Sequence, residues 1–218
     1  SANQILNNRP RRAAPHCCGA RVQHTIAAGA VREYLLARDE LPNVTLRVLA
    51  PINTRTEDEF GQAGNRISAF FPEVHTQIAD PLQRLAAIYD ATRHAKQVAD
   101  GIGAREMTDI TLHSPAALNM LATKLISHTG LMESSAPLFH FGLSNAPGPS
   151  VPMYLCGAQL KAWTVLVPLS HGFGLGFAVT SYLDKLSISF TADRLALPDP
   201  AFFEDCIERS FKVHSQGA

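Results

Sequence analysis

The sequence predicts a mixed α/β fold in which helices pack on one side of a sheet. An Asp or Ser followed by Pro recurs at 80–81, 114–115 and 199–200, where the first residue can cap a helix and the proline occupies its first turn. Between the last two of these signals, five apolar strand-like stretches follow one another with short breaks. With 46% hydrophobic and 17% charged residues over 218 residues, the chain can bury a sizeable core.

Four helices are expected. Residues 22–37 have amphipathic spacing, and each of the three proline signals opens another helix. The Gly-rich stretch 101–105 follows the second helix and is interpreted as its C-terminal cap. The inward-facing residues expected are Ile26, Val31 and Leu35 on the first helix, Leu82, Leu85 and Tyr89 after Asp80, Leu118, Leu121 and Leu125 after Ser114, and Phe203, Ile207 and Phe211 after Asp199.

Two strands are expected before the strand-dense half. Residues 44–50 alternate apolar and polar side chains, and residues 65–71 form a second candidate. The later strands are expected in "LFHFGLSN", "MYLCGAQL", "AWTVLVPL", "FGLGFAVTSY" and "LSISFTA".

Domain organisation and compartment follow from composition. Residues 1–20 lack periodicity and are interpreted as a linker or tail, followed by one domain over 21–218. Nineteen basic and nineteen acidic residues cancel, which argues against nucleic acid as a partner. The four cysteines have no zinc spacing, and reduced thiols in a cytoplasmic protein are expected. No apolar run is long enough to span a bilayer.

The stretch 173–182 places small residues on one strand face. If it is a strand, Gly174, Gly176 and Ala178 share a face that lets another group approach the backbone closely. Tight packing of a neighbouring element explains this face, and so does a flat wall for an acyl chain or pantetheine arm. Both interpretations stay open.

No catalytic base and nucleophile can be assigned from the residues alone. Ser170 and His171 are neighbours, but no G-x-S-x-G elbow surrounds the serine. The other histidines are scattered singly, and the sequence has neither an H-E-x-x-H motif nor a Gly-rich phosphate loop. No metal site is expected.

Three ordered motifs carry a family resemblance. They are "SNAPGP" at 144–149, "PMY" at 152–154 with Gly157 and Ala158, and "PLS" at 168–170 with Gly174 and Leu175. Their order resembles the C-terminal domain of the bacterial wax ester synthase/diacylglycerol acyltransferase family. The resemblance implies one lobe of the superfamily that includes chloramphenicol acetyltransferase and condensation domains.

Upstream stretches extend the resemblance over nearly the whole chain. "LAPINTR" at 49–55 and "GN" at 64–65 are similar to further family elements, and "NNRP" at 7–10 resembles the interdomain linker. Two features depart from the family pattern. The His-His-x-x-x-Asp-Gly signature of the family's N-terminal domain is absent, and Ala20 and Arg21 stand where the family has an Asn-Asp pair.

The resemblance implies a role in acyl transfer from acyl-CoA to a long-chain alcohol or diacylglycerol. The chain would form the second wall of a tunnel whose catalytic base comes from an N-terminal lobe, its expected partner. No cofactor is implied, since acyl-CoA is a substrate. The isolated chain is expected to be inactive, and peripheral contact with a membrane or lipid inclusions is a further expectation.

The resemblance also suggests site residues. Ser144 and Asn145, at the end of an expected strand, would aim a hydroxyl and an amide at the oxyanion. The alternative is that these two side chains only satisfy turn backbone groups. Substrate-binding residues would be Ser170, Gly174, Gly176 and Ala178. The competing function is a non-catalytic acyl-lipid-binding or protein-interaction module derived from the same domain.

Overall fold

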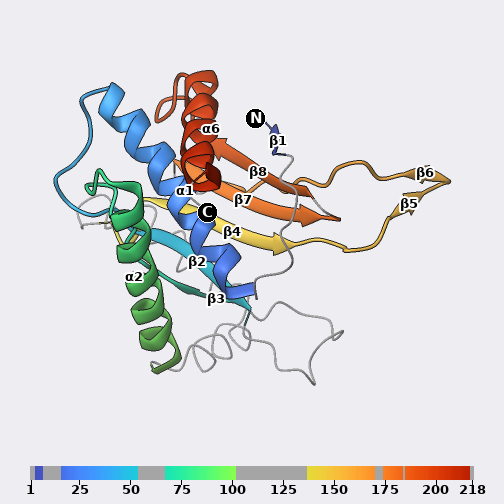
Figure 1. The fold of residues 1–218 in the computed structure, drawn as a ribbon, viewed down its shortest axis with the longest axis horizontal. Helices are drawn as coiled ribbons and strands as arrows, with labels where there is room; N and C mark the ends of the chain where they lie inside the picture. The colour runs from blue at the N-terminus through green and yellow to red at the C-terminus, as the bar shows by residue number, and fades with distance from the viewer. Residues whose placement is uncertain are drawn as a thin grey trace, which may run out of the picture.

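Three helices cover one face of a six-stranded sheet (Figure 1). The computed structural model describes residues 3–6, 16–53, 67–101, 137–169, 174–183 and 185–216, and this architecture holds for that part of the chain. The helices are α1 (His16–Ala37), α2 (Pro81–Gly101) and α6 (Pro200–Gln216). The predicted fold class, a mixed sheet with helices on one side, is confirmed.

The sheet has a parallel centre and antiparallel edges. Its order is β1-β8-β7-β4-β2-β3, in which β4 lies parallel to both β2 and β7, and the remaining pairs are antiparallel. The carboxyl ends of β2, β4 and β7 therefore share one edge of the sheet, where open α/β sheets commonly bind ligands. The strands are β1 (Asn3–Leu6), β2 (Val48–Asn53), β3 (Ile67–Phe70), β4 (Phe141–Pro147), β7 (Leu175–Tyr182) and β8 (Lys185–Ala192).

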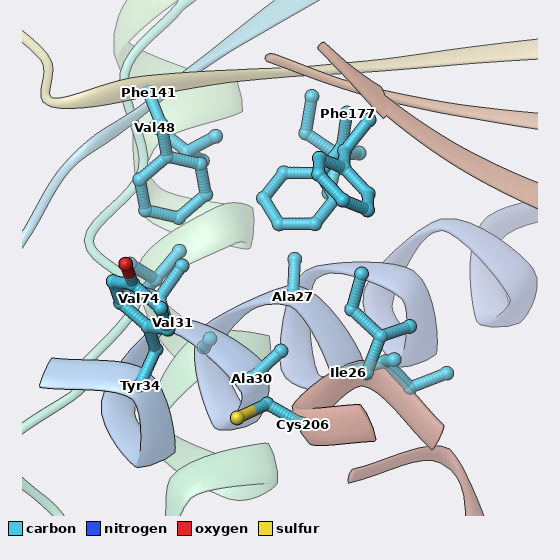
Figure 2. Close-up of a cluster of buried hydrophobic side chains, with 14 of the residues drawn as sticks. Ile26, Ala27, Ala30, Val31, Tyr34, Val48, Val74, Phe141, Phe177 and Cys206 are labelled. Carbon is cyan, nitrogen blue, oxygen red and sulfur yellow. The ribbon is translucent and has the colours of Figure 1, made fainter. Parts of the chain in front are cut away.

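Helix α1 lies at the centre of the core. Residues 23–31 are buried without interruption, because α2 and α6 both contact α1 while the sheet covers its remaining side. Figure 2 shows Ile26, Ala27 and Val31 of α1 beneath Phe141 and Phe177 of the sheet. The two phenylalanine rings meet edge to face at 5.7 Å, a favourable aromatic geometry.

The predicted helix caps are confirmed at two positions. The backbone N–H of Gln83 donates to Oδ1 of Asp80 at 2.7 Å, and that of Phe202 donates to Oδ1 of Asp199 at 3.0 Å. On α6, the predicted inner residues Phe203 and Ile207 are buried. The helix expected after Ser114 lies outside the described residues. Helix α2 ends at Gly101, where the glycine-rich cap was expected.

The predicted inner stripe of α2 is wrong. Leu82 and Tyr89 are exposed, whereas Arg84, Ile88 and Thr92 are buried in a row of spacing four. At 100° per residue, Leu82 and Tyr89 lie roughly 160° and roughly 140° around the helix axis from Arg84, the first row member, and so on the opposite side of the helix. The inner row begins with an arginine, so apolar spacing alone did not reveal it.

The strand expected in "AWTVLVPL" does not form. Both edges of β7 are already occupied, by β4 and β8, so residues 161–169 cannot join the sheet beside it. They run instead over the sheet face opposite the helices, where the hydroxyl of Thr180 donates to the Trp163 carbonyl at 3.1 Å and that of Ser189 donates to the Val165 carbonyl. These hydroxyls satisfy carbonyls that have no ladder partner.

Two boundaries differ from the sequence-based expectation. Residues 3–6 form β1 on β8 and α1 begins at His16, so regular structure starts within the stretch 1–20 that was interpreted as a linker. Strand β2 begins at Val48 rather than at residue 44, although Leu46 and Val48 do alternate inward as predicted. The second strand candidate is confirmed as β3.

Candidate functional site

A cavity of about 230 Å³ lies against the first half of β4. Strands β2 and β4 form one wall, and the segment 165–168 forms the other. The lining residues are Leu49, Pro51, Gly142, Leu143, Ser144, Val165, Leu166, Val167 and Pro168. Ser144 contributes the one side-chain hydroxyl among these otherwise apolar residues. An apolar cleft with a single placed polar group is typical of a ligand site.

Ser144 and Asn145 point to opposite faces of the sheet. They lie inside β4 rather than at its end, because β4 stays paired with β7 as far as Pro147. Successive strand residues alternate between faces, and Phe141 and Leu143 mark the helix-covered face. Ser144 therefore lines the cavity and Asn145, which is exposed, belongs to the other face. The pair does not converge on one point within the strand.

The Pro-Gly-Pro turn after β4 is fixed by a close approach of two backbones. A Cβ placed on Gly148 would lie 2.1 Å from the carbonyl oxygen of Ser181, and the Gly148 N–H donates to the hydroxyl of Ser181 at 3.3 Å. Only glycine fits this contact. The flanking prolines fix φ on both sides, so the chain leaves β4 in one direction.

The small-residue face of β7 has a protein neighbour. Ala178 is 1% exposed because the segment 161–169 covers it, and a Cβ on Gly174 would lie 3.2 Å from that of Ala196. Gly176 is also buried. Close packing, one of the two interpretations, accounts for this face in the folded chain. A substrate reaches Ala178 only by displacing the covering segment.

Several predicted positions cannot be compared with the structure. Ser170, the remaining predicted substrate-binding residue, and His171 beside it lie outside the described residues, as do the family elements at 7–10, 55 and 64–65. The backbones of Ala20 and Arg21 belong to α1. Among the described residues there is no group of three or more His, Cys, Asp or Glu side chains arranged to hold a metal ion.

A two-stranded hairpin projects from the end of the sheet. It comprises β5 (Tyr154–Leu155) and β6 (Ala158–Gln159), which pair antiparallel, and Figure 1 shows it extending well beyond the other strands. We call residues 150–160 the arm. Positive φ angles at Cys156 (48°) and Gly157 (82°) make its tip a tight turn that matches strand twist. Every residue from 151 to 159 is exposed.

The base of the arm is hydrogen-bonded to β7, although the surface of the arm is exposed to solvent. The Met153 N–H donates to the hydroxyl of Tyr182 at 2.9 Å, and the Leu160 N–H donates to the Met153 carbonyl at 2.8 Å. An isolated two-stranded hairpin is at best marginally stable in water. The exposed large apolar side chains of the arm are Val151, Met153, Tyr154 and Leu155.

Sequence reasoning missed a larger apolar cavity of about 680 Å³ between β3 and α2. Its helix wall is built by Ala91, Ala95 and Ala99, and Phe70 and Phe71 close the strand side. The signal that was available is the recurrence of alanine at every fourth residue of an expected helix, which leaves a shallow groove on one side.

The comparisons with known proteins identify the domain. A family model described as the WS/DGAT C-terminal domain matches residues 63–213. The chain belongs to this family. The O-acyltransferase WSD of Acinetobacter baylyi is 32% identical over 175 residues, which cover 79% of this chain and 36% of that protein. The family resemblance suggested by the three motifs is thereby confirmed.

Two solved structures share the fold of this WS/DGAT C-terminal domain. The wax ester synthase/diacylglycerol acyltransferase from Marinobacter aquaeolei VT8 superposes with a TM-score of 0.66 at 24% identity, covering 96% of this chain and 46% of that one. The starter condensation domain of rhizomide synthetase RzmA superposes with a TM-score of 0.52 at 12% identity, covering 97% and 43%. The chain therefore spans less than half of each larger protein.

No helix among the described residues combines the length and apolarity that a membrane crossing requires.

Proposed function

We propose that the chain is the C-terminal lobe of an acyl-CoA-dependent O-acyltransferase that forms wax esters or triacylglycerols. In this role the β4 cavity is one wall of the channel for acyl-CoA and the acceptor alcohol. The observation that carries the proposal is an apolar cavity with one hydroxyl, that of Ser144, beside the parallel strands of a WS/DGAT domain.

The chemistry requires a base that the described lining of this cavity does not supply. In acyl transfer, the acceptor hydroxyl oxygen bonds to the thioester carbonyl carbon, the carbon–sulfur bond breaks, and the hydroxyl proton passes through a base to the leaving thiolate. None of the described residues that line the cavity is titratable. The base is therefore expected on a second lobe. Ser144 would donate a hydrogen bond to the oxyanion formed on the way.

The arm is the surface that we assign to this second lobe. Its base is held by Tyr182, so it is pre-organised to project, while its apolar side chains have no cover among the described residues. The chain matches 36% of the length of its Acinetobacter relative, and the rest of such a protein is large enough to supply a partner surface. Burial of Tyr154 and Leu155 against that lobe would give the hairpin the support that two strands lack.

The test is reconstitution with the N-terminal part of the Acinetobacter O-acyltransferase, by co-expression. We expect neither part alone to transfer acyl groups from acyl-CoA to a long-chain alcohol or diacylglycerol, and the pair to do so. A thiol probe on Cys156, with Cys17 and Cys18 replaced by Ser, should react with the free chain and be excluded from the pair.

Cys206 is the internal control for this labelling. Burial, assisted by the nearby Glu33 carboxylate, raises the pKa of the Cys206 thiol to about 11, so little reactive thiolate forms near neutral pH and this residue should stay unlabelled in both samples. Equal labelling of Cys156 with and without the partner would contradict the assignment of the arm. Turnover by the isolated chain would contradict the two-lobe mechanism.

A second candidate function is a non-catalytic acyl-lipid-binding or protein-interaction module. Ala20 and Arg21 favour it, because they stand where the family resemblance places an Asn-Asp pair thought to hold the two halves together. Saturable binding of acyl-CoA by the chain, together with no turnover when any N-terminal lobe is supplied, would support this alternative over the enzyme.

A further inference from the structure

A third cavity, of about 340 Å³, lies among the helices and concentrates positive charge. It is lined by side chains of α1, the start of α2 and the end of α6, on the helix-covered side of the sheet and away from the face that carries Ser144. Its charged or titratable lining residues are Arg32, Glu33, Arg84, Arg209 and His214. Three guanidinium groups thus face one carboxylate.

The one carboxylate is already engaged. Glu33 forms a charge-assisted hydrogen bond with Arg209. Asp80, the nearest acid to Arg84 along α2, accepts the helix-capping hydrogen bond from Gln83. Neither acid forms an ion pair with Arg32 or Arg84 among the described residues.

Arg84 is a buried cation that has no ion-pair contact among the described residues. Arg84 as a whole is only 4% exposed. Its Nη1 donates hydrogen bonds to the carbonyls of Ile78 at 2.7 Å and Ala79 at 3.3 Å. Its Nε is buried and has no hydrogen-bond partner among the described residues. Burial and then the charge of Arg32 lower the pKa of Arg84, and the Asp80 carboxylate offsets this only in part. A buried, incompletely hydrogen-bonded charge destabilises the fold unless a counter-ion pairs with it.

Arg32 and His214 line the same cavity, and each has at least one nitrogen atom without a hydrogen-bond partner among the described residues. Arg32 uses Nη1 for the carbonyls of Thr76 and Gln77 at 2.7 and 3.1 Å. His214 has Nε2 buried with no partner among the described residues, and the pKa of this histidine is lowered by burial and then by the charge of Arg84. An anion between these groups would be hydrogen-bonded by Arg84 and would favour the protonated, donating form of His214.

The floor of the cavity requires a glycine. A Cβ on Gly29 would lie 2.2 Å from Oγ of Ser210 and 3.2 Å from Nη2 of Arg84. Gly29 of α1 therefore lets α6 and the guanidinium of α2 approach the helix axis. The rim, in contrast, carries the half-exposed apolar side chains of Leu36 and Val213.

We propose that this cavity binds a phosphate monoester, with its dianionic head on Arg84, Arg32 and His214 and its organic part toward Leu36 and Val213. Guanidinium groups match tetrahedral phosphate oxygens in charge and in fork geometry. The volume corresponds to that of about ten water molecules, which exceeds a bare phosphate and leaves room for a substituent. This site is separate from the proposed acyl-transfer channel and does not depend on it.

The test is calorimetric titration of inorganic phosphate into the purified chain in a buffer without phosphate or sulfate. We expect saturable binding to one site. Arg84→Lys and Arg32→Gln should each weaken it by about tenfold or more, because the first removes the guanidinium fork and the second removes a charged hydrogen-bond donor. Arg93→Gln is the matched control on α2, since Arg93 is exposed and outside the cavity, and it should bind phosphate as the unaltered chain does.

Vesicles identify the source of the phosphate. Phosphatidylcholine vesicles doped with phosphatidic acid, a phosphate monoester, should compete with inorganic phosphate if a lipid headgroup is the ligand, whereas vesicles doped with phosphatidylglycerol, a diester, should not. If neither kind of vesicle competes with inorganic phosphate, the ligand is a free phosphate compound. The proposal is overturned if neither inorganic phosphate nor phosphatidic acid binds, or if Arg32→Gln and Arg84→Lys bind phosphate as tightly as Arg93→Gln.

Discussion

The Pro-Gly-Pro turn requires glycine at position 148, because a backbone atom of β7 occupies the space of a side chain. A Cβ there would overlap the Ser181 carbonyl oxygen, which belongs to a paired strand and cannot move alone. Gly148→Ala is expected to lower the free energy of unfolding by about 1–3 kcal/mol, measured by urea denaturation.

Gly157 provides the matched control for this prediction. It has a positive φ of 82° and no atom within 4 Å of its would-be Cβ, so Gly157→Asn keeps a tolerated backbone conformation and meets open space. Its stability should stay close to that of the unaltered chain. Similar losses in the two variants would show that the close approach at Gly148 is not what matters.

Ser144 and Asn145 show how far a motif can predict a site. The motif identified β4 as the strand of interest, and the structure brings Ser144 to a cavity there. Side-chain alternation, however, separates the two residues once the strand continues to Pro147. That continuation depends on pairing with β7, whose Ser181 pairs with Pro147 from far along the chain. The Pro-Gly-Pro turn marks where β4 stops, but local sequence did not show that Ser144 and Asn145 would both be paired within the strand.

At the scale of elements, the segment 161–169 depends on side-chain hydroxyls rather than on a ladder. Thr180→Val removes the donor to the Trp163 carbonyl from a part-buried hydrogen bond, at an expected cost of about 1 kcal/mol. Trp163 is the single tryptophan, so its fluorescence should shift to longer wavelength as the segment loosens.

Thr191→Val is the control for the segment. The Thr191 hydroxyl oxygen is buried with no hydrogen-bond partner among the described residues, so its removal should cost little and leave the Trp163 emission unchanged. An unchanged spectrum and stability in Thr180→Val would mean that apolar packing alone retains the segment.

The same elements show which features were predictable. Asp80 and Asp199 cap their helices through contacts three residues away, so a short stretch of sequence contains the whole signal. The inner face of α2 was not predictable in this way, because Arg84 is buried by α1 and α6, distant in sequence. Residues 161–169 have strand-like composition, but both edges of β7, the strand that they cross, are already occupied by β4 and β8.

At the scale of the whole molecule, the fold presents two chemically opposite sites on the two faces of one sheet. The cavity beside Ser144 is apolar and lies under the segment 165–168, while the cavity around Arg84 is cationic and lies among the helices. The fold class and the family followed from periodicity and motifs. The cationic cavity joins residues 32, 84 and 214, a combination that only the tertiary structure reveals.

The central claim, that Ser144 serves the acyl-transfer channel of a two-lobed enzyme, is tested most directly by turnover of the reconstituted pair. Ser144→Ala should lower kcat more than it raises KM, because the hydrogen bond to the oxyanion exists mainly in the transition state; a loss of roughly 10²-fold is the usual scale. Asn145→Ala, on the opposite sheet face, should change kcat far less. Unchanged kcat in Ser144→Ala, or an equal loss in both variants, would contradict the account.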